Sequence, residues 1–102
     1  MLEEIILGNT TVDALQYIVV TPHGTQELNR FEMIIIQQMM PKPGHIFSRD
    51  LLFEKLYSNK LNISHRAVDV PVSRLRTKLK RIQSDLRIIS KRGVGYCLTS
   101  NL

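Results

Sequence analysis

The segment SHRAVDVPVSRLRTKLKR, residues 64–81, carries the strongest structural pattern in the chain. On a helix with 3.6 residues per turn, its apolar side chains fall on one narrow stripe made of Val68, Val72, Leu75 and Leu79, which Ile82 extends. Ser64 precedes the pattern and is a suitable N-cap, because its hydroxyl can accept a hydrogen bond from an unpaired amide of the first turn. The segment therefore predicts an amphipathic helix whose stripe packs on a core.

The remaining faces of this helix are polar and mostly basic. Opposite the stripe lie Arg66, Val70, Ser73, Thr77 and Arg81. Arg74 lies on one flank, and Asp69, Arg76 and Lys80 lie on the other. Arginine reads guanine edges with paired hydrogen bonds, and serine or threonine can reach bases or phosphates. The pattern is typical of a helix in a DNA major groove, but it fits a solvated surface helix with salt bridges equally well.

Length and composition are those of one small domain. The chain has 102 residues, 43% of them hydrophobic, which is enough for a modest core. No apolar run approaches the ~18 residues that span a bilayer, and the acidic start lacks the basic region of a signal peptide. The single cysteine, Cys97, has no partner within the chain, which fits a reducing compartment. These features predict a cytoplasmic protein that does not enter a membrane.

Charge is unevenly distributed along the chain. Residues 1–64 hold 5 Lys or Arg and 7 Asp or Glu, whereas residues 65–102 hold 9 and 2. A basic half on a small domain indicates a polyanionic partner. Membrane surfaces and acidic proteins are rival partners, although no Trp or Phe accompanies the basic residues as in a membrane-surface helix.

Residues 3–28 predict four short strands in an antiparallel meander. The segments are rich in Ile, Val, Thr and Tyr, and turn residues separate them. Gly24 can take the positive φ that the turn after residue 21 needs. The predicted strands are Glu3–Leu7, Thr10–Asp13, Tyr17–Thr21 and Thr25–Leu28.

Two further helices are predicted in the middle of the chain. Asn29 and Glu32 form a capping-box pattern ahead of an apolar helix over residues 31–40. Apolar residues cover most of its circumference, so this helix should be central and contacted on several sides. Ser48 caps the second helix, which runs through Tyr57.

The remaining segments are a loop and extended pieces. Residues 58–63 are a polar loop, and residues 45–47 predict one short extended pairing. Leu86–Ser90 and Val94–Thr99 predict a terminal hairpin with a Gly-rich, basic turn. The order of four strands, three helices and a hairpin predicts an α+β fold.

No pattern of residues indicates an enzyme. His23, His45 and His65 lie in separate elements without the spacing of metal ligands. Phosphate-binding loops and nucleophile motifs are absent from the sequence. We therefore predict no catalytic residues, no metal, no cofactor and no small-molecule substrate.

A basic helix followed by a Gly-rich basic hairpin resembles a winged helix-turn-helix. The segments Arg66–Val70, Ser73–Arg76 and Arg92–Tyr96 together resemble the C-terminal effector domain of OmpR/PhoB-type response regulators. The resemblance extends over essentially the whole chain, so it implies a single winged-helix domain over residues 1–102. A receiver-like segment is not present in this chain.

The resemblance implies a transcription factor that binds double-stranded DNA as a dimer on tandem half-sites. The helix over residues 64–81 would lie in the major groove, and the hairpin, or wing, in the adjacent minor groove. Arg74 is implied to contact bases and Arg92 to enter the minor groove. Phosphate contacts are implied for Arg66, Ser73, Arg76, Ser90 and Tyr96.

Other candidate contacts come from the helical faces and from the loop. Val70 and Thr77 lie on the face that Arg66 and Ser73 share, so we include them in the predicted DNA-binding set. The loop corresponds to one that touches RNA polymerase in the family that this chain resembles. Its residues are Ser58, Asn59, Lys60, Leu61, Asn62 and Ile63.

The sequence departs from the family pattern at three positions. Ala67 stands where threonine is usual, and Lys91 stands where an apolar residue is common. Pro71 lies inside the predicted helix, where proline removes one amide and costs roughly 3 kcal/mol in a regular interior. We therefore expect either a bend at Pro71 or an irregular first turn.

Two functional hypotheses follow from these observations. The first is a sequence-specific DNA-binding domain that regulates transcription in bacteria, as the output domain of a two-component response regulator. The second is a winged-helix protein-interaction module that binds an acidic protein partner. The basic wing beside the Arg66, Ser73 and Arg74 face favours DNA, because an acidic protein surface needs no groove-spaced projection.

Overall fold

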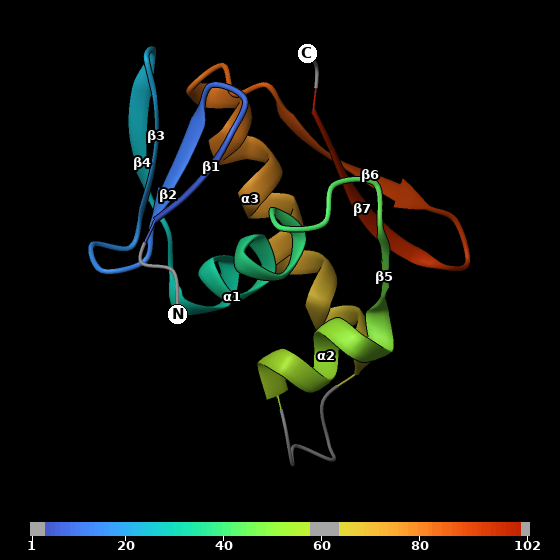
Figure 1. The fold of residues 1–102 in the computed structure, drawn as a ribbon. Helices are drawn as coiled ribbons and strands as arrows, with labels where there is room; N and C mark the ends of the chain where they lie inside the picture. Colours follow the sequence, from blue (N-terminus) through green and yellow to red (C-terminus); the bar gives the residue numbers. More distant parts are fainter. Residues whose placement is uncertain (1–3, 58–63, 101–102) are drawn as a thin grey trace.

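The N-terminal third of the chain is a four-stranded antiparallel sheet, as the sequence predicts (Figure 1). The structure, a computed structural model, describes residues 4–57 and 64–100. The strands are β1 (Glu4–Leu7), β2 (Thr10–Asp13), β3 (Ile18–Thr21) and β4 (Gly24–Glu27), and they pair in chain order. Val12 and Val19 are fully buried opposite one another in β2 and β3, so one face of this sheet closes the core.

Helix α1 (Arg30–Met39) follows the sheet and lies at the centre of the fold. The predicted capping box is present: the Asn29 side chain accepts from the Glu32 amide at 2.9 Å, and the Glu32 side chain accepts from the Asn29 amide at 3.1 Å. Met33, Ile36 and Met39 are buried against other elements. The local cap explains where the helix begins, and its apolar residues explain why it is central.

The terminal hairpin belongs to a three-stranded sheet. Strand β5 (Ile46–Ser48) leads into helix α2 (Arg49–Tyr57), and Ser48 caps that helix by accepting from the Leu51 amide. Strands β6 (Leu86–Lys91) and β7 (Gly95–Ser100) form the hairpin, and the sheet order is β5-β7-β6. The extended segment predicted near residues 45–47 therefore pairs with the wing, a partner that the sequence did not specify.

The segment that the sequence predicts as one helix has an irregular start. Residues His65–Val68 form a 3-10 turn, here η1, and helix α3 (Asp69–Arg81) continues from it. Pro71 is the third residue of α3, so it lies in the first turn that follows η1 and not in a regular helix interior, and proline is best tolerated near the start of a helix. The irregular first turn is thus the correct one of the two expected outcomes, and the interior cost of proline does not apply.

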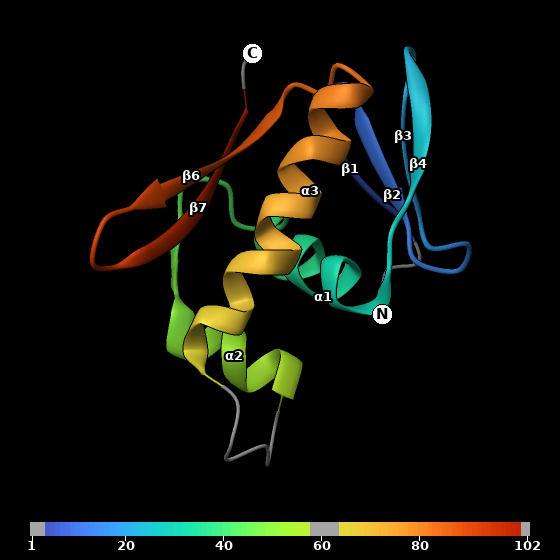
Figure 2. The same ribbon diagram turned by 180° about the vertical axis from the view of Figure 1, so that it is seen from behind.

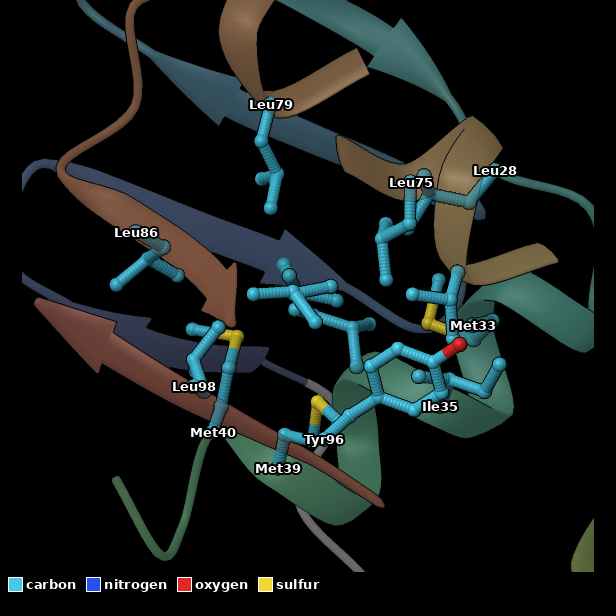
Figure 3. Packing of buried hydrophobic residues seen from close by; sticks show 14 of the residues in the cluster. Leu28, Met33, Ile35, Met39, Met40, Leu75, Leu79, Leu86, Tyr96 and Leu98 are labelled. Carbon is cyan, nitrogen blue, oxygen red and sulfur yellow. The ribbon is translucent and has the colours of Figure 1, made fainter. Parts of the chain in front are cut away.

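The core lies between α1, α3 and the two sheets (Figure 3). Val72, Leu75 and Leu79 are each at most 2% exposed, which confirms the predicted apolar stripe of α3. They pack in one cluster with Leu28 after β4 and Leu98 on β7. This burial of one stripe orients α3, because the opposite face must then point to solvent.

Polar contacts also hold the C-terminal end of α3 to the N-terminal sheet. The Asn9 amide donates to Asp85 Oδ2 at 2.9 Å, and the Asp85 amide donates to Asn9 Oδ1 at 2.8 Å. The Thr21 hydroxyl donates to the carbonyl of Ile82, the residue that caps α3. Helix α3 is therefore fixed at its end by the sheet and along its length by the core. Among the residues that the structure describes, no helix has the length and hydropathy to cross a bilayer.

Candidate nucleic-acid interface

One side of α3 is free of covering elements (Figure 2). The exposed side chains on this side are those of Val70, Ser73, Arg74 and Thr77, and Arg66 of η1 is exposed as well. Val70 is 52% exposed although it is apolar. This arrangement confirms the division of faces that the helical periodicity predicts. Arginines, a hydroxyl and a free apolar side chain are the groups that read base edges and thymine methyl groups.

Helix α2 packs against η1, the turn that leads into α3, as in a helix-turn-helix. Arg49, its first residue, forms an ion pair with Asp69, the first residue of α3, with Nε 2.8 Å from Oδ1. The hydrogen bond to Asp69 raises the pKa of the Arg49 guanidinium above its ordinary value. Sequence reasoning missed this pair, because nothing in residue spacing relates positions 49 and 69.

The wing turn projects beside α3, away from the N-terminal sheet (Figure 1). Its residues Arg92, Gly93 and Val94 are exposed, and Lys91 precedes them. The Val94 amide donates to the Lys91 carbonyl at 2.8 Å, and Gly93 has a φ of +76°. A positive φ favours glycine, so Gly93 makes a tight turn possible and leaves two cationic side chains at its edge.

Arg76 lies against the wing. Its Nε donates to the Ile88 carbonyl at 2.8 Å, and its Nη2 donates to Ser90 Oγ at 2.7 Å. The periodicity placed Arg76 on a flank of the helix, and the structure agrees, with that flank turned toward β6. The implied phosphate contacts of Arg76 and Ser90 stay predictions, since each side chain already has a partner within the protein.

Tyr96 is 4% exposed and lies under the base of the wing. Its hydroxyl donates to Asp69 Oδ1. Burial, together with this hydrogen bond, raises the pKa of Tyr96, so the phenol remains a proton donor. Burial also acts to raise the pKa of Asp69, but the hydrogen bonds from Tyr96 and Arg49 outweigh it and hold that pKa below its usual value. A phosphate contact of Tyr96 likewise stays a prediction.

Most of the positive charge of this surface has no acidic partner among the described residues, although the charge of Arg66 helps to lower the pKa of Asp69. Within the described part of the chain, Arg66, Arg74 and Arg92 form no ion pair. The two acidic residues after position 64 are both engaged, Asp69 by Arg49 and Tyr96, and Asp85 by the Asn9 amide. Exposed arginines without ion-pair partners on adjoining elements are suited to bind a polyanion. The predicted polymerase-contact loop, residues 58–63, lies outside the described residues.

One further predicted side chain has an internal contact. The Thr77 hydroxyl donates to the Ser73 carbonyl at 3.2 Å, one turn earlier in α3. Such a bond uses the hydroxyl hydrogen and leaves the methyl group and the acceptor lone pairs of the hydroxyl available at the surface. Thr77 is exposed, so its predicted contact needs no change in the helix.

Comparison with known proteins agrees with this arrangement. The family model described as "Transcriptional regulatory protein, C terminal" matches residues 23–98. The heme response regulator HssR of Staphylococcus epidermidis is 30% identical over 97% of this chain and 44% of its own length. The sensory transduction protein BceR of Bacillus subtilis is 36% identical over 83% of this chain and 37% of its own. The chain thus spans less than half the length of these relatives.

Solved structures share the fold. The DNA-binding domain of the response regulator AdeR, in complex with an intercistronic region, superposes with a TM-score of 0.78 and 32% identity, covering 93% of this chain and 97% of that one. The C-terminal domain of the nisin resistance regulator NsrR superposes with a TM-score of 0.77 and 29% identity, covering 93% and 95%. The chain belongs to the family of transcriptional regulatory protein C-terminal domains, the winged-helix effector domains of OmpR/PhoB-type response regulators.

Proposed function

We propose that this chain binds double-stranded DNA in a sequence-specific manner and regulates transcription as the output domain of a bacterial response regulator. The observation that carries this proposal is the exposed Arg66, Ser73 and Arg74 face of α3 beside the exposed Arg92 of the wing. A helix face and a projecting hairpin that each carry unpaired arginines are suited to a major groove and to the minor groove next to it.

Each exposed residue has a distinct role in this proposal. Arg74 reads a base edge in the major groove, and Val70 lies against a thymine methyl group. Arg66, Ser73 and Thr77 hold the DNA backbone, and Arg92 enters the minor groove, where narrow A·T-rich segments attract arginine. For Arg76, Ser90 and Tyr96 the proposed phosphate contacts are added to the internal hydrogen bonds described above.

The proposal extends to assembly and partners. Residues 1–102 act as one winged-helix domain in the cytoplasm, and two copies bind tandem half-sites. Residues 58–63 contact RNA polymerase. The AdeR domain and the Klebsiella pneumoniae RstA domain, which is 25% identical with a TM-score of 0.75, were both solved in complex with DNA, and this supports DNA as the partner.

Comparing two cationic side chains of α3 tests the proposal. After selection of a binding site from random duplexes, Arg74→Ala should reduce the ratio of specific to non-specific affinity by about 5- to 150-fold, the equivalent of about 1–3 kcal/mol for one bidentate arginine–guanine pair. Lys80→Ala removes the same charge from the flank of α3 and is the matched control. It should weaken both classes of site together and reduce the salt slope by about one phosphate.

Measurements at two salt concentrations distinguish the alternatives. Equal losses from Arg74→Ala and Lys80→Ala on specific and scrambled duplexes would remove Arg74 from the reading face. If the affinity of the unaltered protein for duplex DNA does not change with salt, the DNA proposal itself is wrong, and the basic face would serve an acidic protein partner instead.

A further inference from the structure

We propose that Arg49, Asp69 and Tyr96 form a positioning unit that sets the direction of the wing relative to α3, and so determines how strongly the wing discriminates among minor grooves. The inference rests on the proposed DNA-binding function and goes beyond it, because it gives these side chains a role within the protein that is separate from the phosphate contact proposed for Tyr96. Arg49 and Asp69 were not among the residues that the sequence pointed to.

The unit joins three elements at one carboxylate. Asp69 begins α3, Arg49 begins α2, and Tyr96 is the second residue of β7. Asp69 Oδ1 accepts from the Tyr96 hydroxyl and from Arg49 Nε at 2.8 Å, and Oδ2 accepts from Arg49 Nη2 at 3.4 Å. The Asp69 carboxylate therefore connects α2, α3 and the base of the wing.

The Tyr96 ring adds a second set of contacts to this junction. The guanidinium carbon of Arg49 lies 5.6 Å from the ring centroid, and that of Arg76 lies 5.5 Å from it. Arg76 also bonds the Ile88 carbonyl and the Ser90 hydroxyl on β6. Both strands of the wing are thus connected to α3, β7 through Asp69 and β6 through Arg76.

The backbone around Tyr96 leaves little room for adjustment. Tyr96 pairs with Phe47 and Gly95 pairs with Ser48 in the β5–β7 ladder. A Cβ atom on Gly95 would lie 2.0 Å from the Phe47 carbonyl oxygen, so β7 approaches β5 as closely as glycine permits. Because β5 leads directly into α2, its pairing with β7 holds the base of the wing next to Arg49, the first residue of α2.

Among the described residues, no side-chain hydrogen bond is seen from the tip of the wing, although Gly93 and Val94 border a hollow that Ser48 and Arg49 also line. Arg92, Gly93 and Val94 are exposed, and the turn is closed by the bond between Val94 and Lys91. The direction of the tip therefore depends on the base of the wing at Tyr96, four residues after Arg92. If the base is loosened, Arg92 samples more orientations and loses part of its minor-groove affinity, whereas α3 keeps its buried stripe and its major-groove contacts.

A double-mutant cycle separates positioning from direct phosphate contact. On a duplex with an A·T-rich flank, Tyr96→Phe should lower affinity about fivefold, and in the Arg92→Ala background it should lower affinity less than twofold. Asp69→Asn should behave in the same way. A Tyr96 that acts only through a phosphate contact predicts equal losses in both backgrounds, and that result would overturn the inference.

The control substitution and a readout without DNA complete the test. Tyr17→Phe removes a hydroxyl in the turn between β2 and β3, on the N-terminal sheet, and should leave both affinities unchanged. In the free protein, Tyr96→Phe should lower the NMR order parameters of residues 91–94 and change the orientation of the wing relative to α3 from residual dipolar couplings. If Tyr96→Phe leaves the couplings unchanged, the positioning unit is wrong. If the variant changes the couplings but the unaltered protein does not bind DNA, only the DNA-binding proposal is wrong.

Discussion

Two glycines in the wing serve different purposes at the residue scale. Gly93 has a φ of +76° with open space around it, whereas a Cβ on Gly95 would overlap the Phe47 carbonyl. Alanine at position 93 therefore meets only backbone strain, but alanine at position 95 must push β7 away from β5. The two glycines are two residues apart, so alanine substitutions at positions 93 and 95 provide a matched comparison of backbone strain with steric overlap.

We expect Gly95→Ala to reduce the free energy of unfolding by roughly 2–4 kcal/mol, because backbone atoms must move to relieve the overlap. Gly93→Ala should reduce it by about 1 kcal/mol, the usual strain of a non-glycine residue at positive φ. Urea unfolding of both variants measures the difference. Equal losses would mean that β7 can shift without consequence.

At the scale of elements, Lys78 connects α3, α1 and β4. Its Nζ donates to Glu32 Oε1 at 2.6 Å and to the Glu27 carbonyl at 2.7 Å. Glu32 is fully buried and also completes the cap of α1. Among the described residues, its second carboxylate oxygen has no hydrogen-bond partner, so this buried charge depends on Lys78.

Lys78→Met should therefore lower the free energy of unfolding by roughly 3 kcal/mol, because it leaves a buried carboxylate without its cation. Adding Glu32→Gln should recover at least about 1 kcal/mol, since a neutral amide can still accept from the Asn29 amide. Lys80→Met, on the exposed flank of the same helix, is the control and should change stability by less than about 0.5 kcal/mol. Equal stability of the single and double variants would show that Lys78 contributes packing instead of charge.

At the scale of the whole molecule, positive charge is concentrated in the half that carries the proposed interface. Residues 65–102 hold 9 Lys or Arg and 2 Asp or Glu, whereas residues 1–64 hold 5 and 7. The few acidic groups in the basic half therefore have structural roles. Asp69 is the clearest case, because it joins α2, α3 and the wing.

The depressed pKa of Asp69 predicts a loss of stability in acid. Its contribution is complete above the unfolded pKa of about 4 and disappears as the pH falls through the lower folded value. Allowing for solvent screening of the exposed Arg49, Asp69→Asn should be less stable by about 1 kcal/mol at pH 6. This difference should shrink toward zero as the pH falls below the unfolded pKa and through the lower folded value. Urea unfolding across this range measures it, and a difference that does not vary with pH would contradict the assignment.

Local features of the protein could be predicted from its sequence because they depend on nearest neighbours along the chain. The periodicity of residues 64–81 determined which side of α3 is buried, and Asn29 with Glu32 determined where α1 begins. Turn residues located each strand to within about one residue. These are short-range effects, in which a residue and its neighbours three or four positions away decide the outcome.

The tertiary structure alone decided which distant residues meet. β5 pairs with β7 across almost fifty residues, Arg49 reaches Asp69, and Arg76 turns to β6 instead of solvent. The helical pattern assigned Arg76 to a flank but contained no information about the strand beside it, and nothing local indicated that the hydroxyl of Tyr96 would be buried on Asp69. Such contacts depend on how α2, α3 and the wing pack over a shared core, and packing is a property of the folded chain as a whole.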